Sequence, residues 1–341
     1  PVPQSPVVPS PSRWRRTTAR VDWFLVAIMG AVLLASVLPA RGSAAQVFDA
    51  LVIAAVAWLF FLYGVRLKTA EALAALRNWK LHSVVLALTF VLFPAIGLAT
   101  QLIPDSVLDP ELKLGVLFLT LLPSTVQSSI AFVSIARGNV AGAVVAASFS
   151  NLAGVLLTPI LVGLLMGGAV GFSMTSVTKV ALQLLAPFVA GQLVRRWLAP
   201  WVFRHPKLIA VTDRGSVVLV VYAAFSQGVV DGIWQRVSLG AVGMLVVLSC
   251  VILALVLVIS SRAGKALGFS RADRAVIIMC GSKKSLATGV PIATILFAPG
   301  LVGIMVLPLM IFHQIQLVVC AVLARRMGHA GLQRLNPADQ G

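Results

Sequence analysis

The sequence predicts an all-α integral membrane protein of ten transmembrane helices, arranged as two inverted five-helix repeats. Of its residues, 59% are apolar and 11% are charged, whereas soluble domains have roughly 45–50% and 25%. Apolar stretches near the ~20 residues that cross a bilayer recur along the whole chain. Lys and Arg gather in alternate connections between these stretches, so the count of ten and the orientation support each other.

Each expected helix is an apolar run bounded by polar residues. The runs are 22–40, 48–65, 82–103, 112–136, 140–166, 177–198, 215–235, 238–261, 272–297 and 300–324. The organisation that follows is a disordered basic N-terminal tail (1–21), a first repeat (22–166), a connector (167–176), a second repeat (177–326) and a C-terminal tail (327–341). Because five is odd, the second repeat enters the membrane from the opposite face, as in inverted-repeat transporters.

The net charge of +17 lies in loops between apolar spans and therefore does not indicate nucleic-acid binding. Most Lys and Arg fall in loops on one side, while the other side carries only Arg41, Lys113, Lys179 and Arg236. This bias places both termini in the cytoplasm of a multi-pass inner (plasma) membrane protein. The three cysteines are far apart in the sequence, so we expect no disulfide framework, no metal site and no cofactor.

The fourth span contains LLPSTVQSSIAF, a proline followed by a polar cluster. Pro123 removes a backbone donor, and the side chains that follow can satisfy a broken helix or coordinate a solute. The candidate substrate- or ion-binding residues here are Thr125, Gln127, Ser128 and Ser129. The alternative is a kinked helix whose hydroxyls join neighbouring helices.

The ninth span, at the matching position of the second half, contains CGSKKSLATGVP. Lysines near the centre of a span cost roughly 2.5–3.5 kcal/mol each, so they should face a wet or protein-lined cavity. We interpret Ser282, Lys283, Lys284 and Ser285 as a cationic site where two broken helices cross. The alternative is that both lysines extend toward the membrane surface, or that the span is misplaced.

Three further polar residues are site candidates. Ser148 and Asn151 lie on one face of the fifth span, where they can contact a ligand or pack between helices. His313 in the tenth span is a possible proton relay, although a structural histidine fits the pattern as well. No acidic residue is expected inside a span, so carboxylate-driven ion coupling has no evident carrier.

Several of these segments resemble the bile acid:sodium symporter (BASS, solute carrier family 10) family. They are GVRLKTAEALAALRNWKLH from Gly64, LPSTVQSSIAFVSIARGNVAGAVV from Leu122, LLTP from Leu156 and CGSKKSLATGVPIATILF from Cys280. The GSKKS segment is most similar to the bacterial branch that resembles vertebrate solute carrier family 10 member 7. The resemblance implies a core domain and a panel domain, two unwound helices that cross at midplane, and alternating access for an organic anion.

The sodium ligands that the resemblance implies are mostly replaced. A Ser-Asn pair of the sodium-coupled branch corresponds to Ser128 and Ser129, and a sodium-binding glutamate corresponds to Met279. Glutamines of that branch correspond to Lys283 and Thr89. The departures argue against classical sodium coupling and against bile-acid transport, but not against the fold.

The function that these residues favour is secondary transport of a small organic anion, in a lipid bilayer and without nucleic acid. One alternative is a non-transporting regulator of ion homeostasis on a transporter scaffold. A remote alternative is an intramembrane hydrolase with a Ser-Lys dyad, although Ser282 and Lys283 would point apart on a helix. An enzyme is therefore not expected.

Overall fold

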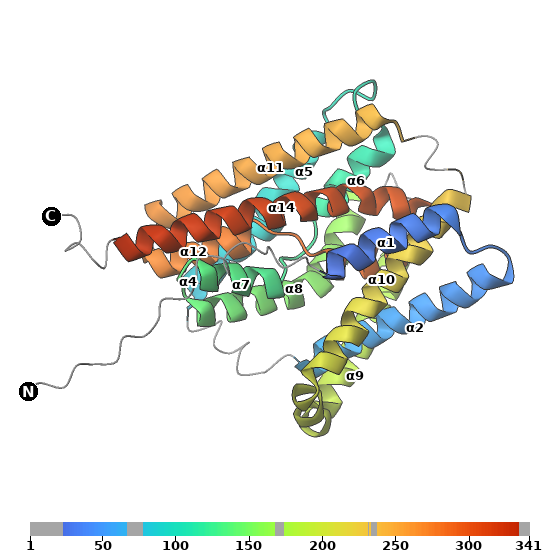
Figure 1. The fold of residues 1–341 in the computed structure, drawn as a ribbon, viewed down its shortest axis with the longest axis horizontal. Helices are drawn as coiled ribbons and strands as arrows, with labels where there is room; N and C mark the ends of the chain where they lie inside the picture. Colours follow the sequence, from blue (N-terminus) through green and yellow to red (C-terminus); the bar gives the residue numbers. More distant parts are fainter. Residues whose placement is uncertain (1–22, 67–77, 168–173, 231, 233–236, 334–341) are drawn as a thin grey trace, which may run out of the picture.

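The computed structural model describes residues 23–66, 78–167, 174–230, 232 and 237–333, and within these ranges every regular element is a helix (Figure 1). The elements are α1 (Trp23–Val37), α2 (Ser43–Arg66), α4 (Trp79–Ala87), the π-helical turn η2 (Leu88–Leu92), α5 (Phe93–Thr100), α6 (Pro110–Thr120), α7 (Gln127–Ile135), α8 (Val140–Met166), α9 (Met174–Arg204), α10 (Pro206–Val230), α11 (Leu239–Ala266), α12 (Arg271–Gly281), α13 (Leu286–Leu296) and α14 (Pro299–Gln333). The expected tail 1–21 and most of the connector lie outside the described residues.

The chain is a multi-pass membrane protein. Six helical stretches in its described part are long and apolar enough to cross a bilayer. They are α2, the continuous stretch from α4 to α5, α8, α10, α11 and α14. On α11 the exposed side chains include Val247, Val251 and Leu255, which suits a face that contacts lipid.

The helix bounds differ from the sequence-based expectation mainly at α10, which begins at Pro206 and not near residue 215. Proline is well suited to the first turn of a helix, where no backbone donor is needed. Asp213 consequently lies within a helix that is long and apolar enough to cross a bilayer, and not in a loop before residue 215 as the sequence predicts. At the other end of the chain, α14 continues to Gln333, beyond the expected start of the C-terminal tail.

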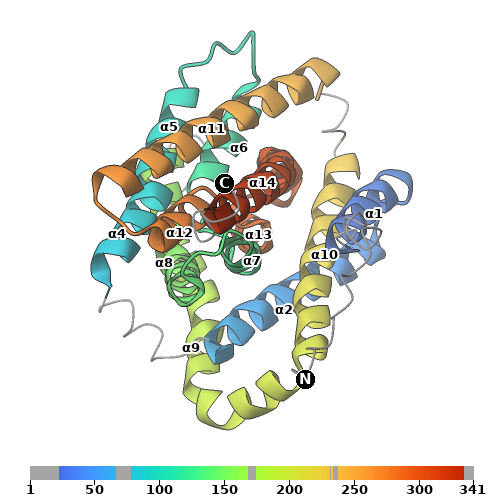
Figure 2. The ribbon, with the colours of Figure 1, turned by 60° about the vertical axis from the view of Figure 1, so that its left-hand side comes forward.

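The helices form two groups (Figures 1 and 2). One group consists of α1, α2, α9 and α10, with α2 packed on α9 and α1 on α10. Glycines allow the first of these contacts, because a Cβ atom at Gly64 or Gly191 would overlap the carbonyl of Phe188 or Phe61 on the facing helix. The other group contains α4 to α8 and α11 to α14, and α14 packs along α6, α7, α11 and α13.

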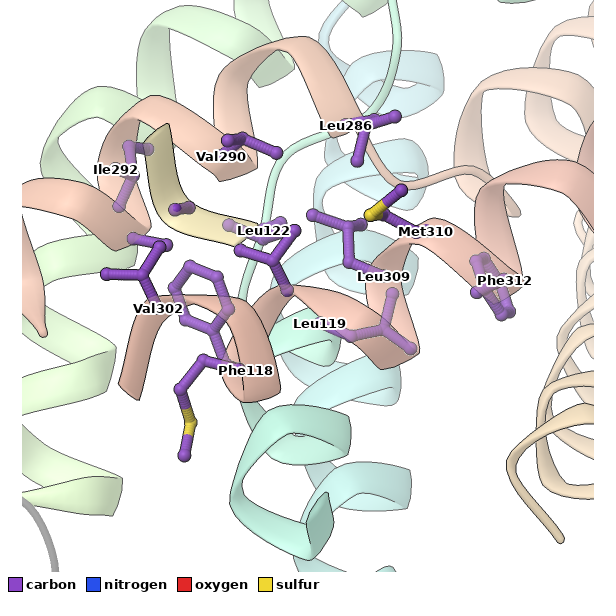
Figure 3. Close-up of a cluster of buried hydrophobic side chains, with 14 of the residues drawn as sticks. Phe118, Leu119, Leu122, Leu286, Val290, Ile292, Val302, Leu309, Met310 and Phe312 are labelled. Carbon is purple, nitrogen blue, oxygen red and sulfur yellow. The ribbon is translucent and has the colours of Figure 1, made fainter. Parts of the chain in front are cut away.

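Two helices of the second group are interrupted, and the interruptions contact each other. The chain is non-helical between α6 and α7, around Pro123, and again between α12 and α13. The backbone N–H of Ser285 in the second break donates to the carbonyl of Pro123 in the first, at 2.9 Å. Figure 3 shows apolar side chains around this crossing, from α6 (Phe118), from the first break (Leu122) and from α13 and α14.

Candidate functional site

Lys284 joins the two breaks through three hydrogen bonds. Its ammonium Nζ donates to the carbonyl oxygens of Thr89, Thr120 and Leu122 at 2.8, 2.7 and 2.6 Å. The side chain is fully buried. An ammonium has three donors and no acceptor, so this set of carbonyls uses its whole donor capacity.

The three carbonyls are available because local sequence removes their helical partners. In η2 the N–H of Phe93 bonds to Leu88, and the next residue, Pro94, has no N–H, so the carbonyl of Thr89 has no partner within its helix. Thr120 and Leu122 lie where α6 ends, and the last carbonyls of a helix have no partner along the chain. A cation is favoured at this negative end of the helix dipole.

The end of α12 is satisfied in a different way, by hydroxyl groups. Ser282 donates to the carbonyl of Ile278 at 2.6 Å, Ser124 to that of Cys280 at 2.6 Å, and Ser129 to that of Met279 at 3.3 Å. All three serines are buried. The polar clusters that the sequence predicts at the two breaks therefore satisfy each other's helix ends, which is a structural role.

Lys283 has no such partners, although it is also fully buried. Its Nζ atom forms no hydrogen bond within the described residues. It lies 3.8 Å from the centroid of the Phe132 ring on α7, a cation–π distance. The titratable groups that act on it electrostatically are the thiols of Cys280 and Cys320.

A cavity of about 560 Å³ lies between the two groups of helices. Seven of the site residues expected from the sequence line it: Thr125, Gln127, Ser128, Ser148, Asn151, Ser285 and His313. The four others, Ser129, Ser282, Lys283 and Lys284, are buried beside the breaks and do not belong to its lining. The two lysines therefore lie behind the cavity wall in this conformation.

Hydrogen bonds hold the polar side chains on the cavity wall that the second group of helices forms. The hydroxyls of Thr125 and Ser128 are 2.7 Å apart. Ser285 caps the N-terminus of α13, and its hydroxyl donates to Thr288, which in turn donates to the side-chain oxygen of Asn151 at 2.8 Å. Polar groups from the first break, the second break and α8 thus converge on one side of the cavity.

The opposite wall carries charged residues that the sequence interpretation missed. Arg66 forms an ion pair with Asp213 at 3.2 Å, and the other carboxylate oxygen, Oδ1, is buried without a hydrogen-bond partner in the described part of the chain. Arg214 reaches across the cavity to the Gln127 side-chain oxygen at 3.4 Å. Hydropathy places Arg66, Asp213 and Arg214 in loops, because charged residues near the end of a span resemble loop residues. Pro206 is the sequence signal that α10 starts earlier.

His313 connects the cavity to the second break. Its ring nitrogen Nδ1 is 2.9 Å from the amide nitrogen of Gln316. The Gln316 amide in turn accepts from the backbone N–H of Lys284 and donates to the carbonyl of the same residue, both at 2.9 Å. A movement of the His313 ring can therefore affect the second break through the Gln316 side chain.

The hydrolase alternative finds no support in these contacts. The Lys284 ammonium bonds to carbonyls, and Ser285 bonds to Thr288. Ser282 donates to a backbone carbonyl, and within the described residues Lys283 has no hydrogen-bond partner. A Ser-Lys dyad requires a hydrogen bond between the two side chains.

Two interrupted helices that cross beside a polar cavity are the arrangement of a membrane transporter. The chain belongs to the SBF-like CPA transporter family, whose sequence model matches residues 22–329. Bile acid:sodium symporters are the wider group that the sequence resembles, and the relatives are transporters and not enzymes.

Three relatives illustrate the similarity. An uncharacterized protein of Pseudomonas aeruginosa is 52% identical over 307 residues, which are 89% of this chain and 92% of the relative. The putative symporter YfeH of Escherichia coli is 51% identical over 308 residues, 90% and 92% of the two chains. The sodium/bile acid cotransporter 7 of Rattus norvegicus is 28% identical over 316 residues, 89% and 92%.

The hydrogen bonds of Lys284 lead to a stability prediction with a matched control one residue away. Lys284→Met leaves three buried carbonyls without a donor, each at a cost of about 1–3 kcal/mol, partly offset because a buried charge is removed. We expect a much lower melting temperature and less folded protein in the membrane. Lys283→Met, which breaks no hydrogen bond, should be tolerated at neutral pH. Equal destabilisation by both substitutions would contradict the role assigned to Lys284.

Proposed function

We propose that the protein is a secondary transporter that moves a small organic anion across the cell inner membrane by alternating access. The observation that supports this most directly is the cavity between the two groups of helices. Its described lining combines two guanidinium groups, Arg66 and Arg214, with one carboxylate, Asp213, and several hydroxyls and amides. Arginine binds carboxylate, sulfonate and phosphate groups in a bidentate manner, which favours an anionic solute.

The proposed architecture is ten membrane spans in two inverted five-helix repeats. The breaks after α6 and α12 occupy the fourth span of each proposed half, as expected for such repeats. We assign α1, α2, α9 and α10 to a panel domain and the other helices to a core domain. Solute would bind where the breaks meet the panel, and movement of the core against the panel would change the side from which the cavity is reached.

The proposed orientation places both termini in the cytoplasm. Positively charged loops favour the cytoplasmic side. Lys207 lies in the first turn of α10, beside the connection to α9, whereas Arg41 lies in the connection between α1 and α2 on the opposite side. Arg66 and Phe203 of the cavity wall lie at helix ends on the Lys207 side, so the conformation described here would open toward the cytoplasm.

Sodium coupling is not part of the proposal, although the name of the rat relative includes sodium. A sodium ion between crossed helices would need the oxygens of unpaired backbone carbonyls, and the Lys284 ammonium already bonds to three of these. A second cation ~5 Å away would be repelled by about 3 kcal/mol at an effective dielectric of ~20. We therefore propose that Lys284 acts as a permanent internal cation in place of a transported one.

The orientation is tested by cysteine labelling in cells. Each reporter is a single cysteine, Lys207→Cys or Arg41→Cys, in a chain whose three native cysteines are replaced by alanine. A membrane-impermeant maleimide should label Arg41→Cys in intact cells and Lys207→Cys only after permeabilisation. Labelling of Lys207→Cys in intact cells would overturn both the orientation and the inverted repeat.

The anion site is tested by thermal-shift screening of the purified protein against small carboxylates, sulfonates and phosphate esters. Ligands that stabilise the wild type should lose at least tenfold in affinity in Arg214→Gln, because a charge-assisted hydrogen bond contributes about 1.5–3 kcal/mol. Ser128→Ala should weaken the same ligands with little loss of stability.

Ser129, the neighbour of Ser128, supplies the control for the thermal-shift experiment. Ser129→Ala should lower stability and leave ligand affinity unchanged, since Ser129 faces the α12 helix end and not the cavity. If no anion stabilises the protein or crosses the membrane in proteoliposomes, while deletion still changes cellular ion levels, the regulator alternative would be favoured.

Sodium independence is tested on the protein without any solute. Melting temperatures in sodium chloride and in choline chloride at equal ionic strength should agree, because the unpaired carbonyls that a sodium ion would need are bound by Lys284. Uptake of any stabilising anion should likewise be equal in the two salts. A saturable stabilisation by sodium would refute the assignment, and Lys284→Gln would then show whether the lysine limits the effect.

A further inference from the structure

Two adjacent lysines at the second break have opposite surroundings. Lys284 donates all three of its protons to carbonyl oxygens. Lys283 is equally buried, yet its Nζ atom has no hydrogen-bond partner among the described residues. The sequence gives the two residues the same chemistry, so the difference arises from the fold alone.

A permanently charged ammonium is poorly accommodated at Lys283. Burial of a charge is costly unless hydrogen bonds and an opposite charge compensate it. The Phe132 ring gives one cation–π contact, and the nearby titratable groups are the thiols of Cys280 on α12 and Cys320 on α14. Thiols are mostly neutral at pH 7. A neutral amine is compatible with these surroundings, because it can remain buried without a counter-ion.

The Phe132 ring contacts both Lys283 and the cavity. Phe132 is part of the cavity lining, and its ring centroid lies 3.8 Å from Nζ. Displacement of this ring would bring the amine into contact with the cavity, where Arg66 and Arg214 already favour an anion. Lys283 is therefore concealed in the present conformation, and the Phe132 ring that covers it is part of the cavity wall.

We propose that Lys283 carries a coupling proton, so that the protein is a proton–anion symporter; this inference rests on the proposed transport function. With Phe132 displaced, the amine takes a proton from water on one side of the membrane, and the resulting ammonium binds the anion. After the change of access, the anion and the proton both leave on the other side. The neutral amine is then covered again by Phe132. One proton and one negative charge cross together, so no sodium ion is needed.

Five other titratable groups line the cavity. They are Tyr63 and Arg66 on α2, Asp213 and Arg214 on α10, and His313 on α14. Asp213 is paired with Arg66, and His313 contacts Gln316. These two residues are the rival proton carriers, and substitutions at them serve as controls.

The test is the pH dependence of the melting temperature of the whole purified protein, measured without solute. Unfolded lysine stays protonated below about pH 10. If Lys283 is neutral when folded, acid favours the unfolded chain, and the melting temperature should fall by several degrees from about pH 9 to about pH 6. Lys283→Met should remove most of this slope, whereas Asp213→Asn and His313→Gln should retain it. An unchanged slope in Lys283→Met overturns the proposal.

Two further variants keep the test decisive. Lys283→Arg, which holds its charge, should be less stable than wild type over this pH range, and equal stability would show that a fixed charge is tolerated.

If the Lys283 variants do not fold, acetic anhydride labelling of wild type and Phe132→Ala replaces them. Peptide mass spectrometry should show Lys283 acetylated several-fold faster in Phe132→Ala, with Lys207 as the internal reference. Equal acetylation rates of Lys283 in wild type and Phe132→Ala would reject the proposal that Phe132 controls access to Lys283.

No outcome of this test depends on a transported solute. A protein that binds no anion could still show the slope that belongs to Lys283, and only the proposed transport function would then fail. If anions bind at the Arg214 site while Lys283→Met keeps the wild-type slope, only the proton inference fails.

Discussion

Lys284 sets the arrangement of the helices around the crossing. An interrupted membrane helix exposes carbonyl oxygens in a place where water cannot satisfy them. Here one buried ammonium bonds to three such oxygens, two at the end of α6 and one beside the π-helical turn η2. The two breaks and the helical stretch from α4 to α5 are thereby joined at a single atom, the Lys284 Nζ. Cavity-lining residues such as Ser128 and Ser285 lie beside the two breaks that this contact joins.

The carbonyl oxygens at the ends of α6 and α12 are satisfied by different chemical groups. The carbonyls at the end of α6 are bound by an ammonium and by the hydroxyl of Thr158, which donates to Leu121 at 2.8 Å. Those at the end of α12 are bound by three serine hydroxyls. A hydroxyl adds no charge, so the positive charge near the crossing comes from lysine alone. A transported ion can enter and leave its site, whereas a covalently attached ammonium stays.

Hydropathy and charge bias predicted the helical stretches well, because the cost of exposing polar groups to lipid constrains sequence strongly. The breaks were also predictable, from Pro123 and from the polar cluster around Lys283 and Lys284. The separate roles of the two lysines were not, because the chain is not helical there and the direction of each side chain depends on contacts such as those with Thr89 and Phe132. Asp213 was missed for another reason. A hydropathy window treats a charged residue near a span end as loop, although a cavity can solvate it inside the membrane.

The distribution of polar contacts indicates which part of the molecule can move. Contacts at the crossing are buried and mostly short, whereas Arg214 and Gln127 meet across the cavity at 3.4 Å in an exposed position. Exposed polar contacts contribute little to stability and exchange readily with water or ligand. Under the proposed function, Arg214 would release Gln127 and bind the anion without loss of a buried hydrogen bond. A solute that enters the cavity would replace a weak protein contact with a charged one, and the energy gained is available to favour one arrangement of the two groups over the other.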